Sequence, residues 1–169
     1  MTHRIAVCPG SFDPVTLGHL DLVRRASALA DEVVVAVGTG YGKNALLTPA
    51  QRRDLFADAV AHLPGVRVQL MSGLLIDLCR EVGATAVIKG IRGGADYDHE
   101  QPMALMNRHL AGIETVFLPA DASVVHISST MVRDVARYGG PIGDLVPPGV
   151  EEAVRAALAA RTTTRREQP

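Results

Sequence analysis

The sequence predicts an α/β protein built on a doubly wound, five-stranded parallel sheet. Short runs of β-branched and other apolar residues alternate along the chain with segments of helical periodicity, as in consecutive βαβ units. One of these runs, residues 32–37, is almost wholly apolar, which is typical of a strand covered by helices on both faces. The chain of 169 residues suits a single domain, which we expect over residues 1–161, with residues 162–169 as a flexible C-terminal tail.

The first half of the chain predicts a strand, a helix, a second strand and a capped helix. The first strand is expected over residues 5–8, and the helix over 19–29 has its apolar residues at helical spacing. After the second strand, Thr48 can cap a helix that starts with proline, and Gln51 can close a capping box. This helix is expected over residues 49–63 and ends before a Pro-Gly pair.

The second half continues the alternation and ends with two helices in succession. Gly83 ends the third helix, and Pro102 inside the fourth should stand near its first turn or at a kink. The remaining strands are expected over 66–70, 86–88 and 115–118, and the remaining helices over 74–82, 97–110, 128–138 and 150–160. Right-handed crossovers then place helices on both faces of the sheet.

Composition and charge restrict the class of protein. Hydrophobic residues make up 47% and charged residues 21% of the chain, as in an ordinary globular protein. The formal net charge of −1 argues against a generic nucleic-acid coat or a polybasic membrane binder. Cys8 and Cys79 show neither zinc-site nor disulfide-framework spacing. No apolar run approaches a membrane span or a signal sequence, so we expect a reduced cytoplasmic protein without nucleic-acid or membrane partners.

Candidate site residues follow the strands, because ligands of such sheets bind beyond the carboxyl ends of the strands. Gly18 and His19 stand at a helix start after the first strand, where free N–H groups suit phosphate; the alternative is a βα turn with a capping histidine. The loop after the second strand matches neither of two known phosphate-binding patterns. Lys43 stands where the dinucleotide fingerprint needs glycine, and Asn44 stands where the P-loop needs serine or threonine. Lys43 is therefore either a phosphate ligand on a glycine-rich loop or a solvated surface lysine.

Two further segments bring phosphate-compatible groups to the same edge of the sheet. Lys89 and Arg92 follow the fourth strand among glycines, and Ser128, Ser129 and Thr130 open a later helix. Capping accounts for one of these three hydroxyls. Neither a nucleophile elbow nor an acidic cluster is evident, so no side-chain metal ligand is assigned. The residues imply positioning and charge stabilisation around phosphates, with an oxygen of the substrate attacking.

Two motifs are similar to those of the nucleotidylyltransferase superfamily. Residues 10–14 (GSFDP) with 16–19 (TLGH) resemble its first motif, and residues 127–133 (ISSTMVR) resemble its second. A third segment contains KGIR at 89–92, ADY at 95–97, Glu100 and MNRHL at 106–110. This segment resembles the phosphopantetheine adenylyltransferase family of bacterial coenzyme A synthesis, and the similarity covers nearly the whole chain.

The resemblance implies a Rossmann-like nucleotidylyltransferase fold and the transfer of the adenylyl group of ATP to 4′-phosphopantetheine. The products would be dephospho-coenzyme A and pyrophosphate, formed by direct in-line displacement without a covalent enzyme intermediate. The resemblance also implies Mg2+ as a cofactor that accompanies ATP, a homohexameric assembly, and coenzyme A as a feedback ligand.

The same resemblance implies a role for each matching residue. His19 is expected to contact the α-phosphate and to stabilise the charge that develops in the transition state. The expected catalytic residues are His19, Lys43, Arg92 and Thr130. Substrate binding is expected from Ser11, Lys43, Leu75 (in the pantetheine channel) and Lys89 (on the acceptor phosphate). ATP contacts are expected from Ser11, Phe12, His19, Gly90, Ile91, Arg92, Glu100, Val124, Val125, His126, Ile127, Ser128, Ser129 and Thr130.

Some positions depart from the family's pattern, and other functions share part of it. Val124 and His126 stand where the family usually has aromatic residues, and Asn44 stands where a second basic residue is common. A nicotinate mononucleotide adenylyltransferase shares the two motifs but lacks the segment from residue 89 to 110. A cytidylyltransferase for an alcohol phosphate is a more distant alternative. A nucleotide-binding regulator without catalysis would show damage at His19, Lys43 or Arg92, and all three residues are intact.

Overall fold

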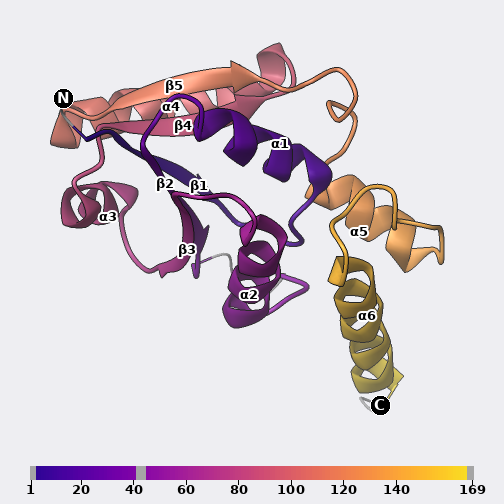
Figure 1. Cartoon of the computed structure of the whole chain (residues 1–169). Coiled ribbons are helices and arrows are strands. Elements are labelled where there is room, and N and C mark those ends of the chain that lie inside the picture. Colours follow the sequence, from indigo (N-terminus) through magenta and orange to yellow (C-terminus); the bar gives the residue numbers. More distant parts are fainter. Residues whose placement is uncertain (1–2, 41–44, 167–169) are drawn as a thin grey trace.

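The computed structural model describes residues 3–40 and 45–166, with side chains described as far as residue 161. Five parallel strands form one sheet in the order β3-β2-β1-β4-β5. The strands are β1 (Ile5–Gly10), β2 (Glu32–Gly38), β3 (Val66–Met71), β4 (Ala86–Ile91) and β5 (Glu114–Pro119). The helices are α1 (Leu17–Ala26), α2 (Pro49–Val60), α3 (Leu75–Val82), α4 (Gly94–Ala111), α5 (Ser129–Arg137) and α6 (Val150–Arg166). The predicted α/β class and parallel sheet are confirmed (Figure 1).

Helices cover both faces of the sheet, and each face has its own apolar core. Along β2, Val33, Val35 and Val37 pack in the core shared with α1 and α2. Val34 and Ala36, which alternate with them, pack in the core shared with α3. A strand that is buried on both faces has no solvated side, which explains its unbroken apolar run. Helices α5 and α6 join the first core and lie on the far side of the molecule from α3 (Figure 1).

Strand β1 lies at the centre of the sheet, and the strand order reverses beside it. β1 pairs with β2 on one side, with Cys8 opposite Val35, and with β4 on the other, with Val7 opposite Val87. The two halves of the sheet therefore wind away from each other at the β1/β4 pair. In open parallel sheets such a reversal leaves a crevice at the carboxyl ends of the strands, where ligands bind.

Local sequence signals set several helix ends. The capping box of α2 is confirmed: the backbone N–H of Thr48 donates to Gln51 Oε1 at 2.9 Å, and Thr48 Oγ1 accepts from the Gln51 backbone at 3.2 Å. Helix α4 begins earlier than predicted because Gly94 joins the helix and only Gly93 is extended. Pro102 consequently lies in the middle of α4, so the first of its two expected positions, near the first turn, was wrong.

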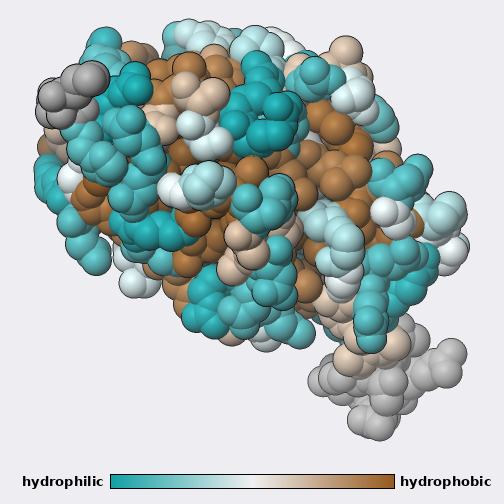
Figure 2. Space-filling model, in the orientation of Figure 1, coloured by the Kyte–Doolittle hydropathy of each residue, from teal (hydrophilic) through white to brown (hydrophobic). Residues whose placement is uncertain are grey.

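The C-terminal helix is longer than its sequence pattern indicated. α6 runs to Arg166, past the predicted end near residue 160. The last part of the predicted tail, residues 167–169, lies outside the described residues. No helix in the described part of the chain has the length and apolarity to cross a bilayer. On the face seen in Figure 2, apolar residues reach the surface between polar ones.

Candidate active site

A cavity of about 440 Å³ opens at the carboxyl ends of β1, β4 and β5. Its walls come from the loop after β1, from β4 with the start of α4, from the end of β5, and from the start of α5. Twelve of the predicted residues line it: Ser11, Phe12, His19, Lys89, Gly90, Arg92, Glu100, Val124, Ile127, Ser128, Ser129 and Thr130. The fold thus brings segments that are far apart in the sequence to one edge of the sheet.

His19 is oriented by the residues that precede it in the chain. The backbone N–H of Thr16 donates to His19 Nδ1 at 3.0 Å, and Thr16 Oγ1 lies 3.1 Å from the same nitrogen. The ring packs at 89° to Phe12, with centroids 5.0 Å apart. Because Nδ1 accepts a hydrogen bond from an amide, the single proton of the neutral ring sits on Nε2. His19 therefore presents one N–H donor from the wall of the cavity.

The surroundings of His19 keep its ring neutral. Two causes lower the pKa of His19 to about 4: burial, which is the larger, and the positive charge of Arg92. The imidazole is then uncharged at neutral pH and acts as a hydrogen-bond donor rather than as a cation. A neutral donor still stabilises negative charge that develops on a nearby oxygen.

We expect the protonation of His19 to occur well below neutral pH. An NMR titration of the His19 ring should show no transition near the ordinary pKa of 6.5 and a shift only on approach to pH 4. Because the unfolded chain takes up this proton near pH 6.5 and the folded chain does not, acidification from 6.5 towards 4 should lower the free energy of unfolding. In Arg92→Ala the His19 pKa should rise, since one of its causes is removed. A wild-type transition at 6.5 would contradict this account.

Carboxylates of α4 hold two cations at the cavity. Lys89 Nζ lies 2.9 Å from Glu100 Oε2, and Arg92 donates to Asp96 through Nε at 2.8 Å and Nη2 at 3.0 Å. The hydrogen bonds from Arg92 hold the pKa of the Asp96 carboxyl below its ordinary value. Partly exposed ion pairs of this kind contribute little stability. An anionic ligand can therefore replace the carboxylates as the partner of Lys89 and Arg92 with a small loss of free energy.

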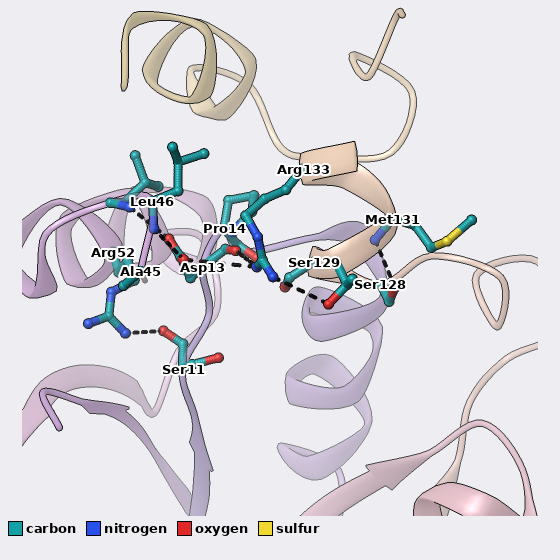
Figure 3. A network of polar contacts seen from close by, with 12 residues as sticks. Ser11, Asp13, Pro14, Ala45, Leu46, Arg52, Ser128, Ser129, Met131 and Arg133 are labelled. Carbon is teal, nitrogen blue, oxygen red and sulfur yellow. Dashed lines mark hydrogen bonds and ion pairs between the residues drawn. The ribbon is translucent and has the colours of Figure 1, made fainter. Parts of the chain in front are cut away.

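The three hydroxyls at the start of α5 each have a partner within the protein. Ser128 Oγ accepts from the backbone of Met131 at 3.2 Å and caps the helix. Ser129 Oγ donates to the carbonyl of Pro14 at 2.7 Å, and Thr130 Oγ1 accepts from Arg133 at 3.3 Å. Capping therefore explains one hydroxyl, as predicted, and the second ties α5 to the loop after β1 (Figure 3).

A buried carboxylate fixes the loop after β1. Asp13, which is 5% exposed, accepts the backbone N–H groups of Leu46 at 2.7 Å and Leu47 at 2.8 Å. Arg133 donates to the backbone carbonyl of Asp13, and its guanidinium lies 3.9 Å from the carboxylate (Figure 3). The first motif is thus bound to the segment that precedes α2 on one side and to α5 on the other.

Close packing in the loop after β1 restricts Gly10 and Phe12, whereas Gly18, at the start of α1, is less restricted. Phe12 has a positive φ of 51°, and its ring packs edge-on against Phe56 with centroids 4.7 Å apart. A Cβ at Gly10 would lie 2.7 Å from the Phe12 ring, so glycine is required there. At Gly18 a Cβ would lie 3.6 Å from its protein neighbours, an ordinary contact, so the protein's own packing leaves that position open towards the cavity.

Comparison with known proteins places the chain in a family. Residues 7–135 match the family model described as cytidylyltransferase-like. The chain is 53% identical over 155 residues to the phosphopantetheine adenylyltransferase of a Nocardioides species, covering 92% of this chain and 98% of the relative. It is 51% identical over 152 residues to the phosphopantetheine adenylyltransferase of Kocuria rhizophila, with 89% and 97% covered. This chain belongs to the phosphopantetheine adenylyltransferase family.

The fold of this family member is also seen in a more distant solved structure. A crystal structure described as a nicotinate-nucleotide adenylyltransferase from Vibrio parahaemolyticus has a TM-score of 0.64, with 90% of this chain and 99% of that chain covered. At 18% sequence identity the likeness concerns the fold alone. The Rossmann-like nucleotidylyltransferase fold expected from the motifs is confirmed.

Some residues matched to the phosphopantetheine adenylyltransferase pattern lie outside the cavity. Leu75 is half-buried and packs against the core beneath α3. Ile91, Val125 and His126 do not contribute to the lining either. Lys43, with its neighbour Asn44, lies outside the described residues.

The cavity of this family member is also lined by polar residues to which the sequence motifs assigned no role, although one of them, Asp96, lies in the ADY segment. Asp21 and Arg25 of α1 both line it, and Arg25 donates to the carbonyl of Pro119 at 2.6 Å. Asp96 and His99 of α4 line it as well. The sequence did contain a signal for Arg25: residues 18, 22 and 25 lie on one face of the helix that begins at the first motif, so Arg25 should face the same way as Gly18.

Proposed function

We propose that this chain transfers the adenylyl group of ATP to 4′-phosphopantetheine, giving dephospho-coenzyme A and pyrophosphate. One observation carries the proposal: in a chain of this family, the first-motif loop with His19 and the 89–100 segment with its two cations meet in one cavity. The cavity volume of about 440 Å³ is within the range of small-molecule sites.

The proposed mechanism is positioning and charge stabilisation. Lys89 and Arg92 bind phosphate groups of the two substrates, which otherwise repel each other. The Nε2–H of His19 donates to an oxygen of the α-phosphate as charge develops on it, and Thr130 contributes from the start of α5. The phosphate oxygen of the acceptor is already ionised. It attacks the α-phosphorus of ATP in line while the bond from that phosphorus to the leaving pyrophosphate breaks, so no covalent enzyme intermediate forms.

The remaining matched residues complete the proposed substrate contacts. Ser11 and Lys43 bind the phosphate region of the acceptor, and Leu75 contacts the pantetheine arm. Residues 124–130 and Glu100 contact ATP together with Phe12. We further propose a cytoplasmic enzyme in which coenzyme A acts as a feedback ligand.

Mg2+ is proposed to accompany ATP rather than to occupy a protein cage. The carboxylates around the cavity are engaged with cations, as Glu100 is with Lys89 and Asp96 with Arg92. Among the residues that the structure describes, no group of three acidic, His or Cys side chains could hold a metal ion. Phosphate oxygens are suitable Mg2+ ligands, and the ion would neutralise charge on the triphosphate.

The deciding experiment is a pyrophosphate-release assay. The purified chain is incubated with ATP, Mg2+ and 4′-phosphopantetheine, and nicotinate mononucleotide serves as the control acceptor. Release with the first acceptor and not with the second is expected. Release only with nicotinate mononucleotide, or with neither acceptor, would reject the proposed function.

We propose a homohexameric assembly, and the outer face of α4 supports self-association. Met103, Met106 and Leu110 lie on one face of this helix and are 57%, 49% and 47% exposed in the single chain. Such a contiguous apolar stripe is typical of an interface.

The double variant Met103→Glu/Met106→Glu should therefore have a smaller mass than the wild type in light scattering coupled to gel filtration. The added charges would have to be buried without partners in an apolar contact. Arg137→Glu, on an exposed part of α5, is the control and should leave the mass unchanged. A wild-type chain that runs as a monomer would contradict the hexamer.

A further inference from the structure

Arg52 of α2 is a buried cation beside the cavity, and no motif indicated it. Its side chain is 1% exposed, although arginine is rarely buried to this degree. Its Nη1 donates to the backbone carbonyl of Ser11 at 2.5 Å and to that of Gly38 at 3.0 Å. Its Nε has no hydrogen-bond partner among the described residues.

The positive charge of Arg52 lacks a carboxylate partner within the described structure. The carboxylate of Asp13, on the same loop as Ser11, accepts instead from the backbone of Leu46 and Leu47 (Figure 3). Arg52 is absent from the ion pairs formed by the described residues, whereas its neighbour Arg53 pairs with Asp54 at 2.7 Å. Burying a guanidinium without an anion is costly, so a purely apolar side chain would be the cheaper way to fill this space.

The position of Arg52 relates it to the cavity wall formed by the loop after β1. The two carbonyls that it binds lie at the carboxyl ends of β1 and β2, and Ser11 lines the cavity. A hydrogen bond to the Ser11 carbonyl fixes the peptide that carries the Ser11 side chain. The guanidinium charge therefore lies directly behind the cavity wall and adds to the positive potential there.

We propose that Arg52 is a positioning residue for adenylyl transfer. It holds the Ser11 peptide in place, and its charge is compensated by the phosphate of the acceptor when that phosphate binds next to Ser11. The proposal rests on the proposed function and, of the two contacts expected for Ser11, relates Arg52 to the one with the acceptor phosphate rather than to the one with ATP. Arg52 does not touch the reacting atoms, and it acts through Ser11 and through its charge.

The test compares Arg52→Gln, Arg52→Lys and the control Arg53→Gln. Steady-state kinetics and calorimetric titration with 4′-phosphopantetheine are run on each folded variant. In Arg52→Gln the KM and the Kd for 4′-phosphopantetheine should rise about tenfold, the loss expected for a hydrogen-bonded charged group, while the KM for ATP changes by less than about threefold. Arg52→Lys should recover most of this loss because it keeps the charge, and Arg53→Gln should match the wild type.

Several outcomes would overturn the proposal. Arg52→Gln could melt at a lower temperature and yet bind the acceptor as the wild type does, and Arg52 would then be a structural residue only. If Arg52→Gln does not fold, the binding of 4′-phosphopantetheine to Arg52→Lys tests the proposal instead. A tenfold loss of binding in Arg52→Lys, which keeps the positive charge, would show that the charge has no role. Wild-type binding of the acceptor without turnover would reject the proposed function alone, and failure of the wild type to bind the acceptor would reject both.

Discussion

His19→Ala is expected to lower kcat by about 10²–10³ and to change the KM for ATP only slightly. Removal of one preorganised donor to a developing negative charge typically has an effect of this size. The backbone of Thr16 fixes the ring through Nδ1, so the donor is already oriented before substrate binds. Because the interaction strengthens in the transition state, its loss appears in kcat more than in binding. Steady-state kinetics of pyrophosphate release would measure both constants.

Two variants control this prediction. His19→Gln retains an N–H donor on a side chain of similar reach and should recover part of the lost rate. His62→Ala removes an exposed histidine beyond the end of α2 and should leave kcat unchanged. Turnover that stays at the wild-type level in His19→Ala would remove His19 from the mechanism.

The second large effect is expected on stability, from Asp13→Ala. This change leaves the buried backbone N–H groups of Leu46 and Leu47 without their acceptor and weakens the contact of Arg133 with the loop. Hydrogen bonds to a charged acceptor contribute about 1.5–3 kcal/mol each, so a loss of roughly 3 kcal/mol or more is expected. For a chain of this size that corresponds to a fall in Tm of about 6–12 °C. Thermal and urea denaturation would measure it.

Asp13→Asn is the matched intermediate case, since its amide keeps one acceptor oxygen for one of the two N–H groups. It should fall between the wild type and Asp13→Ala. Asp54→Ala removes an exposed carboxylate whose described ion pair is with Arg53, and it should change stability by less than about 1 kcal/mol. Equal effects of Asp13→Ala and Asp54→Ala would show that the buried contacts of Asp13 are unimportant.

Much of the fold could be predicted because local patterns reported it directly. The apolar run of β2 predicted burial on both faces, and its valines do divide between the two cores. Thr48 and Gln51 predicted the start of α2 through a capping box that needs only neighbouring residues. Both signals lie in neighbouring residues of the chain, so they can be recognised in the sequence without the tertiary structure.

Helix boundaries and several site residues were harder to predict, for a physical reason. Gly93 and Gly94 are adjacent glycines, and only the folded backbone shows that the second belongs to α4. Arg25 reaches the cavity because β5 places the Pro119 carbonyl beside α1, a contact between residues far apart in the chain. Periodicity describes which face of a helix is apolar and not which loop will lie above it.

The sequence by itself determined the family, the parallel α/β sheet and the residue types gathered at its carboxyl edge. Only the tertiary structure decided the chemical state of those residues. The Thr16 amide selects the tautomer of His19, and burial with the charge of Arg92 keeps the ring neutral. The acids of α4 hold Lys89 and Arg92, while Arg52 is buried behind Ser11 with two carbonyls for partners. Charge and protonation depend on distances in space and on burial, and neither is set until the chain has folded.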